Sequence, residues 1–347
     1  MAAELSTEVS TTQTTYDAIL IVSFGGPEGM DDVMPFLENV LRGRNVPRER
    51  MIDVSHHYAL FDGISPINAQ NRELIAALEP ELRANGVHLP IYWGNRNWQP
   101  YLTDTLRQMT ADGIKNAVAF VTSAYSSYSG CRQYREDIMR AQAEIGSDAP
   151  QVAKLRVFYN HPLFIEANVE NLQAAIDQIP AERRAATSIA FTAHSVPLVM
   201  AQGSKYVMQL QETCRLIAEQ AGLSNWKLVY QSRSGSPRQP WLEPDILQHL
   251  QTLKTEGASD VVVLPVGFVS DHIEVCYDLD TEAQALAAEL DMKLVRAATV
   301  GTHPLYVKMI SELIIERLSH DPARQAIGLY GASHDVCPID CCQIISA

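Results

Sequence analysis

Short apolar runs alternate with longer amphipathic stretches along the whole chain. Eight of these runs are rich in strand-forming residues, and they cover residues 18–24, 89–94, 116–124, 155–160, 188–195, 227–233, 259–269 and 293–300. Most are apolar throughout, which is typical of strands buried on both faces of a sheet. The stretches between them, such as 31–41 and 69–86, have helical spacing. The pattern predicts an α/β protein with parallel sheets flanked by helices.

Eight strands in 347 residues fit two four-stranded domains better than one sheet. We expect a first Rossmann-like domain over residues 17–153 and a second over 154–303. The last amphipathic stretch, at about 304–320, is predicted to be a helix that packs back on the first domain. Residues 321–347 then form a cysteine-containing tail.

Composition narrows the class of protein only a little. The chain is 46% hydrophobic and 20% charged, with a net charge of −14. This acidic balance argues against nucleic-acid partners and anionic membrane surfaces. No run of 18 apolar residues is present, so no transmembrane helix is expected. The first 17 residues are Ser/Thr-rich, without a basic start or apolar core, which favours a disordered tail and a cytoplasmic protein.

Polar and glycine-rich segments follow the predicted strands directly. These segments read "SFGGPEG", "TSAYSSYSG", "TAHSVP", "QSRSGS" and "PVGFVSDHIE". Ligands of open α/β sheets bind beyond the carboxyl ends of the strands, so a site is expected there. "SFGGPEG" is neither G-x-G-x-x-G nor followed by GK[ST], so a turn that approaches a planar ligand is a better interpretation than a nucleotide loop.

His194 ends the run 188–195 and could act as a general base near neutral pH. A core histidine bonded to backbone is an equally good interpretation of its position alone. Ser195 beside it lacks the G-x-S-x-G context of a hydrolase nucleophile. Glu274, Asp278 and Glu282 follow the run 259–269 at intervals of four. A solvated helical face is the usual fate of such charges, but their place after a buried strand favours a proton or divalent-cation site.

Six segments, in this order, give the chain a specific resemblance. They read "SFGGP", "GISPIN", "YWGNRNWQP", "TAHSVP", "QSRSGSPRQPWLEPD" and "GFVSDHIEVCYDLD". Together they closely resemble the ferrochelatases over roughly residues 17–318. The tail and the choice of aromatic residues resemble the actinobacterial branch, the coproporphyrin ferrochelatase type.

The resemblance implies a chelatase-like fold and insertion of Fe2+ into coproporphyrin III to give coproheme. It implies that His194 and Glu274 face each other across the macrocycle as the catalytic pair and hold the substrate iron. It also implies a widened helical turn from Glu274 through Asp278 to Glu282. The last two acids are predicted to relay protons or hydrated iron.

By matching motifs, we expect the porphyrin and its propionates to be bound by Phe24, Arg50, Tyr58, Ser65, Arg96 and Tyr125. The position of Phe24 carries a tyrosine in related enzymes of Gram-positive bacteria with low G+C content, where it can ligate product iron. Phenylalanine has no donor atom, so ring contact is expected here instead.

The tail carries Cys337, Cys341 and Cys342 with the spacing C-x3-C-C. Close thiolates suit a soft-metal site, either zinc or an iron–sulfur cluster, but on spacing alone free thiols of a flexible tail are the better interpretation. The resemblance favours a [2Fe–2S] cluster on these three residues. Its fourth ligand stays open among the remaining Cys131, Cys214 and Cys276.

Two alternatives to the main interpretation remain. One is the same insertion with protoporphyrin IX, and the other is a porphyrin or heme carrier without turnover. We further expect a monomer that makes at most transient contacts with neighbouring enzymes of heme synthesis.

Overall fold

The computed structural model describes residues 15–43, 46–234, 238–319 and 322–343. Most of the predicted N-terminal tail, residues 320–321 and residues 344–347 lie outside this part of the chain. Within it, two parallel four-stranded sheets confirm the predicted fold class. The first has the order β2-β1-β3-β4, and the second β6-β5-β7-β8. Their strands are β1 (Ala18–Ser23), β2 (Ile91–Asn95), β3 (Asn116–Val121), β4 (Gln151–Lys154), β5 (Ser188–His194), β6 (Trp226–Gln231), β7 (Asp260–Leu264) and β8 (Lys293–Arg296).

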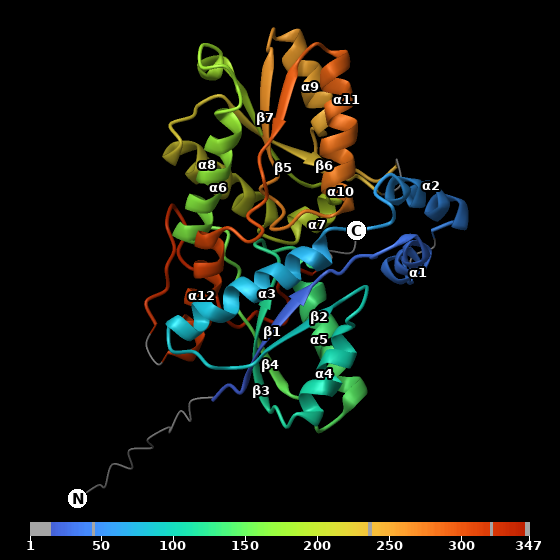
Figure 1. Cartoon of the computed structure of the whole chain (residues 1–347), viewed down its shortest axis with the longest axis vertical. Coiled ribbons are helices and arrows are strands. Elements are labelled where there is room, and N and C mark those ends of the chain that lie inside the picture. Colours follow the sequence, from blue (N-terminus) through green and yellow to red (C-terminus); the bar gives the residue numbers. More distant parts are fainter. Residues whose placement is uncertain (1–14, 44–45, 235–237, 320–321, 344–347) are drawn as a thin grey trace, which may run out of the picture.

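Helices cover both faces of each sheet (Figure 1). In the first half of the chain they are α1 (Met30–Val40), α2 (Arg48–Ala59), α3 (Ile67–Ala84), α4 (Leu102–Ala111), the π-helix η1 (Tyr128–Arg132) and α5 (Gln133–Ile145). In the second half they are α6 (Pro162–Ile176), the 3-10 helix η2 (Arg184–Ala186), α7 (Leu198–Gln202), α8 (Tyr206–Gln220), α9 (Ile246–Thr255), α10 (Ile273–Val275), the π-helix η3 (Cys276–Ala283), α11 (Gln284–Glu289) and α12 (Pro304–Leu318). None of the helices among the described residues has the length and apolar character needed to cross a bilayer.

The fourth strand differs from its prediction. Residues 151–154 form β4, whereas the apolar run 155–160 leaves the sheet after Leu155 and enters the space between the two sheets. There Phe158 stacks on Phe120 of β3 at 5.3 Å between ring centroids. The run is apolar because it crosses the hydrophobic core. A segment that crosses a core has the same composition as a buried strand, so the sequence pattern did not distinguish the two.

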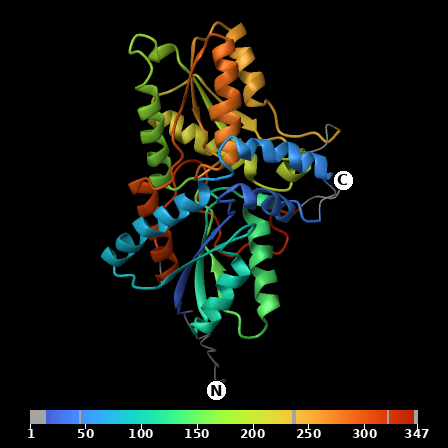
Figure 2. The same ribbon diagram turned by 45° about the vertical axis from the view of Figure 1, so that its right-hand side comes forward.

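One hydrophobic core joins the two halves of the molecule. It contains residues of both sheets, and Tyr306 of α12 lies fully buried among its aromatic rings. The helix α12 packs against α3 from the first half and α6 from the second, and both figures show it beside them at the junction (Figures 1 and 2). The boundary between residues 153 and 154 stays a prediction.

Contacts across the junction come from residues that follow the strands. Tyr125, after β3, donates its hydroxyl hydrogen to the carbonyl of Val266, which follows β7, at 2.9 Å. The backbone N–H of Asp271 donates to Oε1 of Gln70 on α3, also at 2.9 Å. The carboxyl ends of strands from the two sheets therefore face a common region, as the segments that follow the strands predict.

Candidate active site

The side chain of His194 is held at the end of β5 by local backbone. Its Nδ1 contacts the carbonyl oxygen of Ser195, so Nδ1 acts as the donor and Nε2 points away from the strand. The Nε2 atom lies 3.4 Å from Oε2 of Glu274. The two side chains are 33% and 51% exposed, so a ligand can reach the pair, although the protein atoms around both groups are dense enough to disfavour charge on them.

Glu274 reaches this position through a short helical turn after β7. Ile273 and Val275 on either side of it are buried, which leaves the carboxylate on the open face of α10. The helix then widens into η3, an eight-residue π-helix. The predicted widened turn is thereby confirmed.

The structure pairs His194 and Glu274 directly. A flat ring between two groups needs about 3.5 Å on each side, or about 7 Å in all, so the two side chains must separate before a macrocycle lies between them. Their placement on opposite faces of a macrocycle stays a prediction.

Each partner shifts the titration of the other. Burial opposes charge on His194, but the hydrogen bond and the charge of Glu274 outweigh it and raise the pKa of His194. Burial likewise acts to raise the pKa of Glu274, yet His194 lowers it to about 2. Each group therefore stabilises the charged form of the other.

The pKa of Asp278 is shifted in the opposite direction to that of Glu274. Burial raises its pKa to about 7, against the lowering effect of a hydrogen bond from the Ser232 hydroxyl, and the charges of Glu274 and Glu282 raise it further. The side-chain amide of Gln231 also donates to Asp278, at 3.3 Å. Asp278 can consequently take up or release a proton at neutral pH.

The third acid connects to the opposite half of the molecule. Burial raises the pKa of Glu282, and a hydrogen bond from Tyr277 opposes this shift. The ring of Tyr277 stacks on His57 of α2 with centroids 3.7 Å apart. The line from Glu274 through Asp278 to Glu282 thus runs along η3 toward α2.

Aromatic side chains of the first half lie beside the pair of His194 and Glu274. Phe36 contacts Phe24 edge-on at 6.3 Å, and Tyr58 and Trp98 at 6.0 and 6.2 Å. Tyr58 is buried, and burial together with the charge of Glu274 raises its pKa. Phe24 remains 36% exposed and can offer its ring to a flat ligand.

Two predicted propionate partners are occupied elsewhere. The guanidinium of Arg96 is buried, forms an ion pair with Asp137 and lies 4.5 Å from the ring centroid of Tyr134. Tyr125 is buried, and its hydroxyl is bonded to Val266. Arg96 also lies 5.8 Å from the ring centroid of Phe24. Both residues stay predictions as propionate partners.

The remaining predicted partners differ in exposure. Arg50 is on the exposed side of α2, where its distance to Asp53 is 3.9 Å. Ser65 is buried against the backbone of Gly26, where an added Cβ would lie 2.6 Å from the Ser65 Cβ. Gly25 beside it has a φ of +80° and a similarly close contact with Asn95, so the glycine pair shapes the turn through protein packing.

Gln231 and Ser232 were missed as site residues by sequence reasoning. Both belong to "QSRSGS", one of the segments expected to follow a strand. Only the hydrogen bonds that they donate to Asp278 show that they belong to the site. Ser232 has a positive φ of 60°. This backbone conformation is uncommon for serine and cannot be predicted from the sequence.

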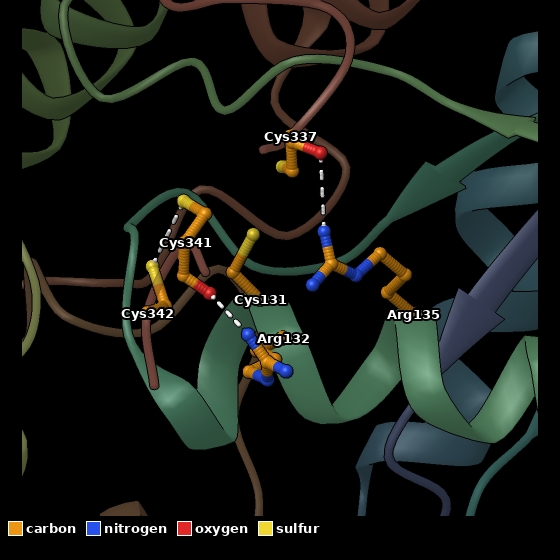
Figure 3. A pocket seen from close by; sticks show the side chains of 6 residues that line it. All are labelled: Cys131, Arg132, Arg135, Cys337, Cys341 and Cys342. Atoms are coloured by element: carbon orange, nitrogen blue, oxygen red, sulfur yellow. Dashed lines mark hydrogen bonds between the residues drawn. The ribbon is translucent and has the colours of Figure 1, made fainter. Parts of the chain in front are cut away.

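A second cluster joins the tail to η1. Cys131 of η1 lines one pocket with Cys337, Cys341 and Cys342, and the neighbouring thiols of Cys337 and Cys342 lower the pKa of Cys131. The Sγ atoms of Cys341 and Cys342 are 3.6 Å apart. Figure 3 shows Cys131 rising from its helix between the tail cysteines. Of the three cysteines left open, the structure therefore brings Cys131 to the tail.

The other two cysteines lie apart from that cluster. Cys214 is fully buried in α8, and burial raises the pKa of its thiol. Cys276 begins η3 beside the acids, where burial also raises its pKa, to about 11. Both therefore stay protonated and pack as small apolar side chains.

The two-sheet fold is that of the metal chelatases. The structure of SirB from Bacillus subtilis with Fe3+ matches with a TM-score of 0.55 and 12% identity, covering 88% of this chain and 96% of that one. A likeness at this identity concerns the fold alone.

Sequence comparison identifies the family. The ferrochelatase profile matches residues 16–318. A ferrochelatase of Rhodopirellula baltica is 57% identical over 328 residues, covering 94% of this chain and 93% of the relative. A coproporphyrin III ferrochelatase of Streptomyces coelicolor is 50% identical over 349 residues, with the same coverage. The chain belongs to the ferrochelatase family, as its motifs indicate.

Proposed function

We propose that this protein inserts Fe2+ into coproporphyrin III and releases coproheme for heme synthesis. Several relatives at 46–50% identity carry the name coproporphyrin III ferrochelatase. The observation that carries the proposal is the exposed pair of His194 and Glu274, continued by Asp278 along η3.

This set of groups suits the two needs of metal insertion. Two pyrrole protons must leave the ring, and a hydrated cation must arrive and lose its water. In the proposal, His194 passes its own proton to Asp278, whose pKa of about 7 allows it to accept one, and then takes a pyrrole proton. Carboxylates that keep some water around a divalent ion suit the delivery of Fe2+, which enters here as a substrate.

The aromatic cluster would supply the binding energy. Phe24 offers an exposed ring, and Phe36, Tyr58 and Trp98 pack behind it. Contact over the macrocycle can offset the cost of distorting the ring so that its nitrogen lone pairs become accessible. Arg50 and Ser65 stay predictions as propionate partners.

Anaerobic insertion of Fe2+ into coproporphyrin III and protoporphyrin IX, measured side by side, tests the proposal. We expect faster formation of coproheme, as kcat/KM, than of heme. Preference for protoporphyrin IX would identify the alternative substrate. Tight binding of both porphyrins without insertion of iron would instead identify a carrier.

We further propose a [2Fe–2S] cluster on Cys131, Cys337, Cys341 and Cys342. The donor chemistry fits, because four thiols converge and Arg132 lies beside them to offset thiolate charge. A bound cluster would supply a one-electron couple, which iron insertion does not use, so we assign it a structural or sensing role. Absorption and EPR spectra of anaerobically purified protein test this assignment. A colourless protein without iron or sulfide would contradict it.

Three expectations on cellular context remain proposals. They are a cytoplasmic location, a monomeric state, and at most transient contacts with neighbouring enzymes of the pathway. Light scattering of the purified protein tests the monomer directly.

A further inference from the structure

The guanidinium of Arg96 lies over the ring of Phe24, the ring that the site offers to a flat ligand. Phe24 and Arg96 follow β1 and β2, which are parallel neighbours with Ser23 opposite Asn95. The backbone N–H of Arg96 donates to the carbonyl of Ser23 at 3.0 Å. Cζ of Arg96 is 5.8 Å from the ring centroid of Phe24. The register of the sheet therefore brings a cation within range of an attractive contact with this ring.

Groups of η1 and α5 hold the guanidinium in this place. Asp137 forms an ion pair with Nε of Arg96, and both side chains are buried. The ring centroid of Tyr134 is 4.5 Å from Cζ of Arg96. Tyr134 and Asp137 are three residues apart in α5, so they lie on the same side of the helix. Nη1 of Arg96 also donates to the carbonyl of Ser129 at 3.4 Å. Arg96 is thus fixed by a second element, and not by its own turn alone.

The charges of this group show which partner depends on the other. Asp137 also pairs with Arg140, which is exposed. The charge of Asp137 therefore has a partner without Arg96. A buried guanidinium, in contrast, is costly unless an acid lies beside it. Asp137 consequently serves to keep Arg96 buried and charged beside the two aromatic rings.

A cation over Phe24 changes what the ring offers to a ligand. Arg96 covers one face, so a flat ligand meets the other face of this partly exposed side chain. The faces of aromatic rings are electron-rich and repel one another when stacked directly. A positive charge on the far face draws electron density away and weakens that repulsion. The macrocycle of a porphyrin is a large electron-rich ring of this kind.

We propose that Asp137 and Tyr134 are positioning residues that hold the Arg96 guanidinium against Phe24, so that the macrocycle stacks more tightly on this ring. The inference rests on the proposed porphyrin substrate. In it Arg96 acts through the ring of Phe24, whereas the contact expected from the sequence is a direct one with a propionate.

A double-mutant cycle between Asp137 and Phe24 tests the proposal, with the full-length protein and coproporphyrin III followed by fluorescence. Asp137→Asn should raise the porphyrin Kd about fivefold, because the guanidinium loses its anchor. The kcat at saturating porphyrin should stay within about twofold of the wild type. In a Phe24→Leu protein, Asp137→Asn should raise the Kd no further, since the ring through which Arg96 acts is absent.

Arg140→Gln is the matched control, because it removes the exposed partner of Asp137 and should leave the porphyrin Kd unchanged. If Asp137→Asn does not fold, Tyr134→Leu takes its place in the cycle, since it removes the second group that holds Arg96.

An equal rise of the Kd with and without the ring of Phe24 would overturn the proposal, because Arg96 would then act directly on a propionate or only on the fold. In a wild type that inserts Fe2+, this result would leave the proposed function intact. A wild type that binds no coproporphyrin III would overturn both.

Discussion

Two carboxyl groups four residues apart have pKa values shifted in opposite directions in this site. Glu274 is paired with His194, and its pKa falls to about 2, whereas Asp278 is shielded from water and its pKa rises to about 7. A charged partner for one group and burial of the other thus move apart the pKa values of two carboxyl groups of similar intrinsic acidity. Such separation is how one site can hold a fixed charge and a mobile proton.

Replacing His194 with alanine should lower the rate of Fe2+ insertion at least about 100-fold, because the proposed acceptor of the pyrrole protons is lost. Porphyrin binding, followed by fluorescence, should change little. The raised pKa of His194 means that the imidazolium persists to higher pH than for a free histidine. The wild-type insertion rate should therefore rise with pH through that pKa.

His88→Ala is a suitable control for this variant, because His88 is exposed and distant from the pair. A wild-type insertion rate in His194→Ala would remove His194 from the mechanism. Equal loss of porphyrin binding and insertion would instead indicate a structural role.

Replacing Asp278 with asparagine should stabilise the fold at pH 8 but not at pH 4. The pKa of Asp278 is about 7 when folded against an ordinary 3.8, so the folded state keeps a proton that the unfolded state has lost. The free energy of unfolding contributed by Asp278 therefore falls as pH rises from about 4 to 7 and stays low above. We expect a gain on the order of 1–2 kcal/mol at pH 8 by urea denaturation.

Asp53→Asn, on the exposed side of α2, is the matching control for removal of a carboxylate and should change the free energy of unfolding little. A uniform effect of Asp278→Asn at both pH values would show that its hydrogen bonds, not its titration, determine the change.

At the scale of elements, η3 decides which acids stay in line. A π-helix has more residues per turn than an α-helix, so Glu274, Asp278 and Glu282 keep a different angular spacing than α-helical geometry would give. Buried Leu279 and Ala283 fix the opposite face in the core. The wider turn is thus held by packing rather than by propensity.

Deleting Thr281 should convert the last part of η3 to α-helical geometry. Each residue in an α-helix turns about 100°, so Glu282 would leave the line while Glu274 and Asp278 remain. We expect insertion to fall about tenfold with porphyrin binding retained, measured as kcat and Kd. Thr281→Ala, which keeps the residue count, should have nearly wild-type turnover. The same loss in both variants would contradict a role for the widened turn.

At the scale of the molecule, the junction between the sheets positions the site. Its aromatic surface comes from the first half and its acids from the second, and the contact between Tyr125 and Val266 connects the halves. The shared core makes the arrangement one packed body rather than two independent sheets.

Replacing Tyr125 with phenylalanine should lower the free energy of unfolding by about 1–3 kcal/mol, because the buried Val266 carbonyl loses its donor. Porphyrin affinity should remain that of the wild type if the Tyr125 hydroxyl keeps its bond to Val266 when the porphyrin binds. Denaturant unfolding and fluorescence titration measure the two quantities.

The exposed Tyr330 offers a control for this variant, and Tyr330→Phe should alter neither quantity. A selective loss of porphyrin affinity in Tyr125→Phe would support its predicted contact with a propionate.

The sequence by itself determined the fold class, the strands other than β4, and the family. Buried strands are apolar throughout, so their positions can be predicted from the sequence. The family can be predicted in the same way, because its motifs keep their residue types and their order along the chain. The predicted positions of His194 and Glu274 at the ends of strands follow from the same logic.

Only the tertiary structure decided how side chains that are distant in sequence meet. It placed Cys131 beside the tail, gave Arg96 a buried partner in Asp137, and put His194 in contact with Glu274. Side-chain pairing depends on how two sheets and a tail pack together. Residue types and their spacing along the chain fix local geometry, but they do not fix these distances.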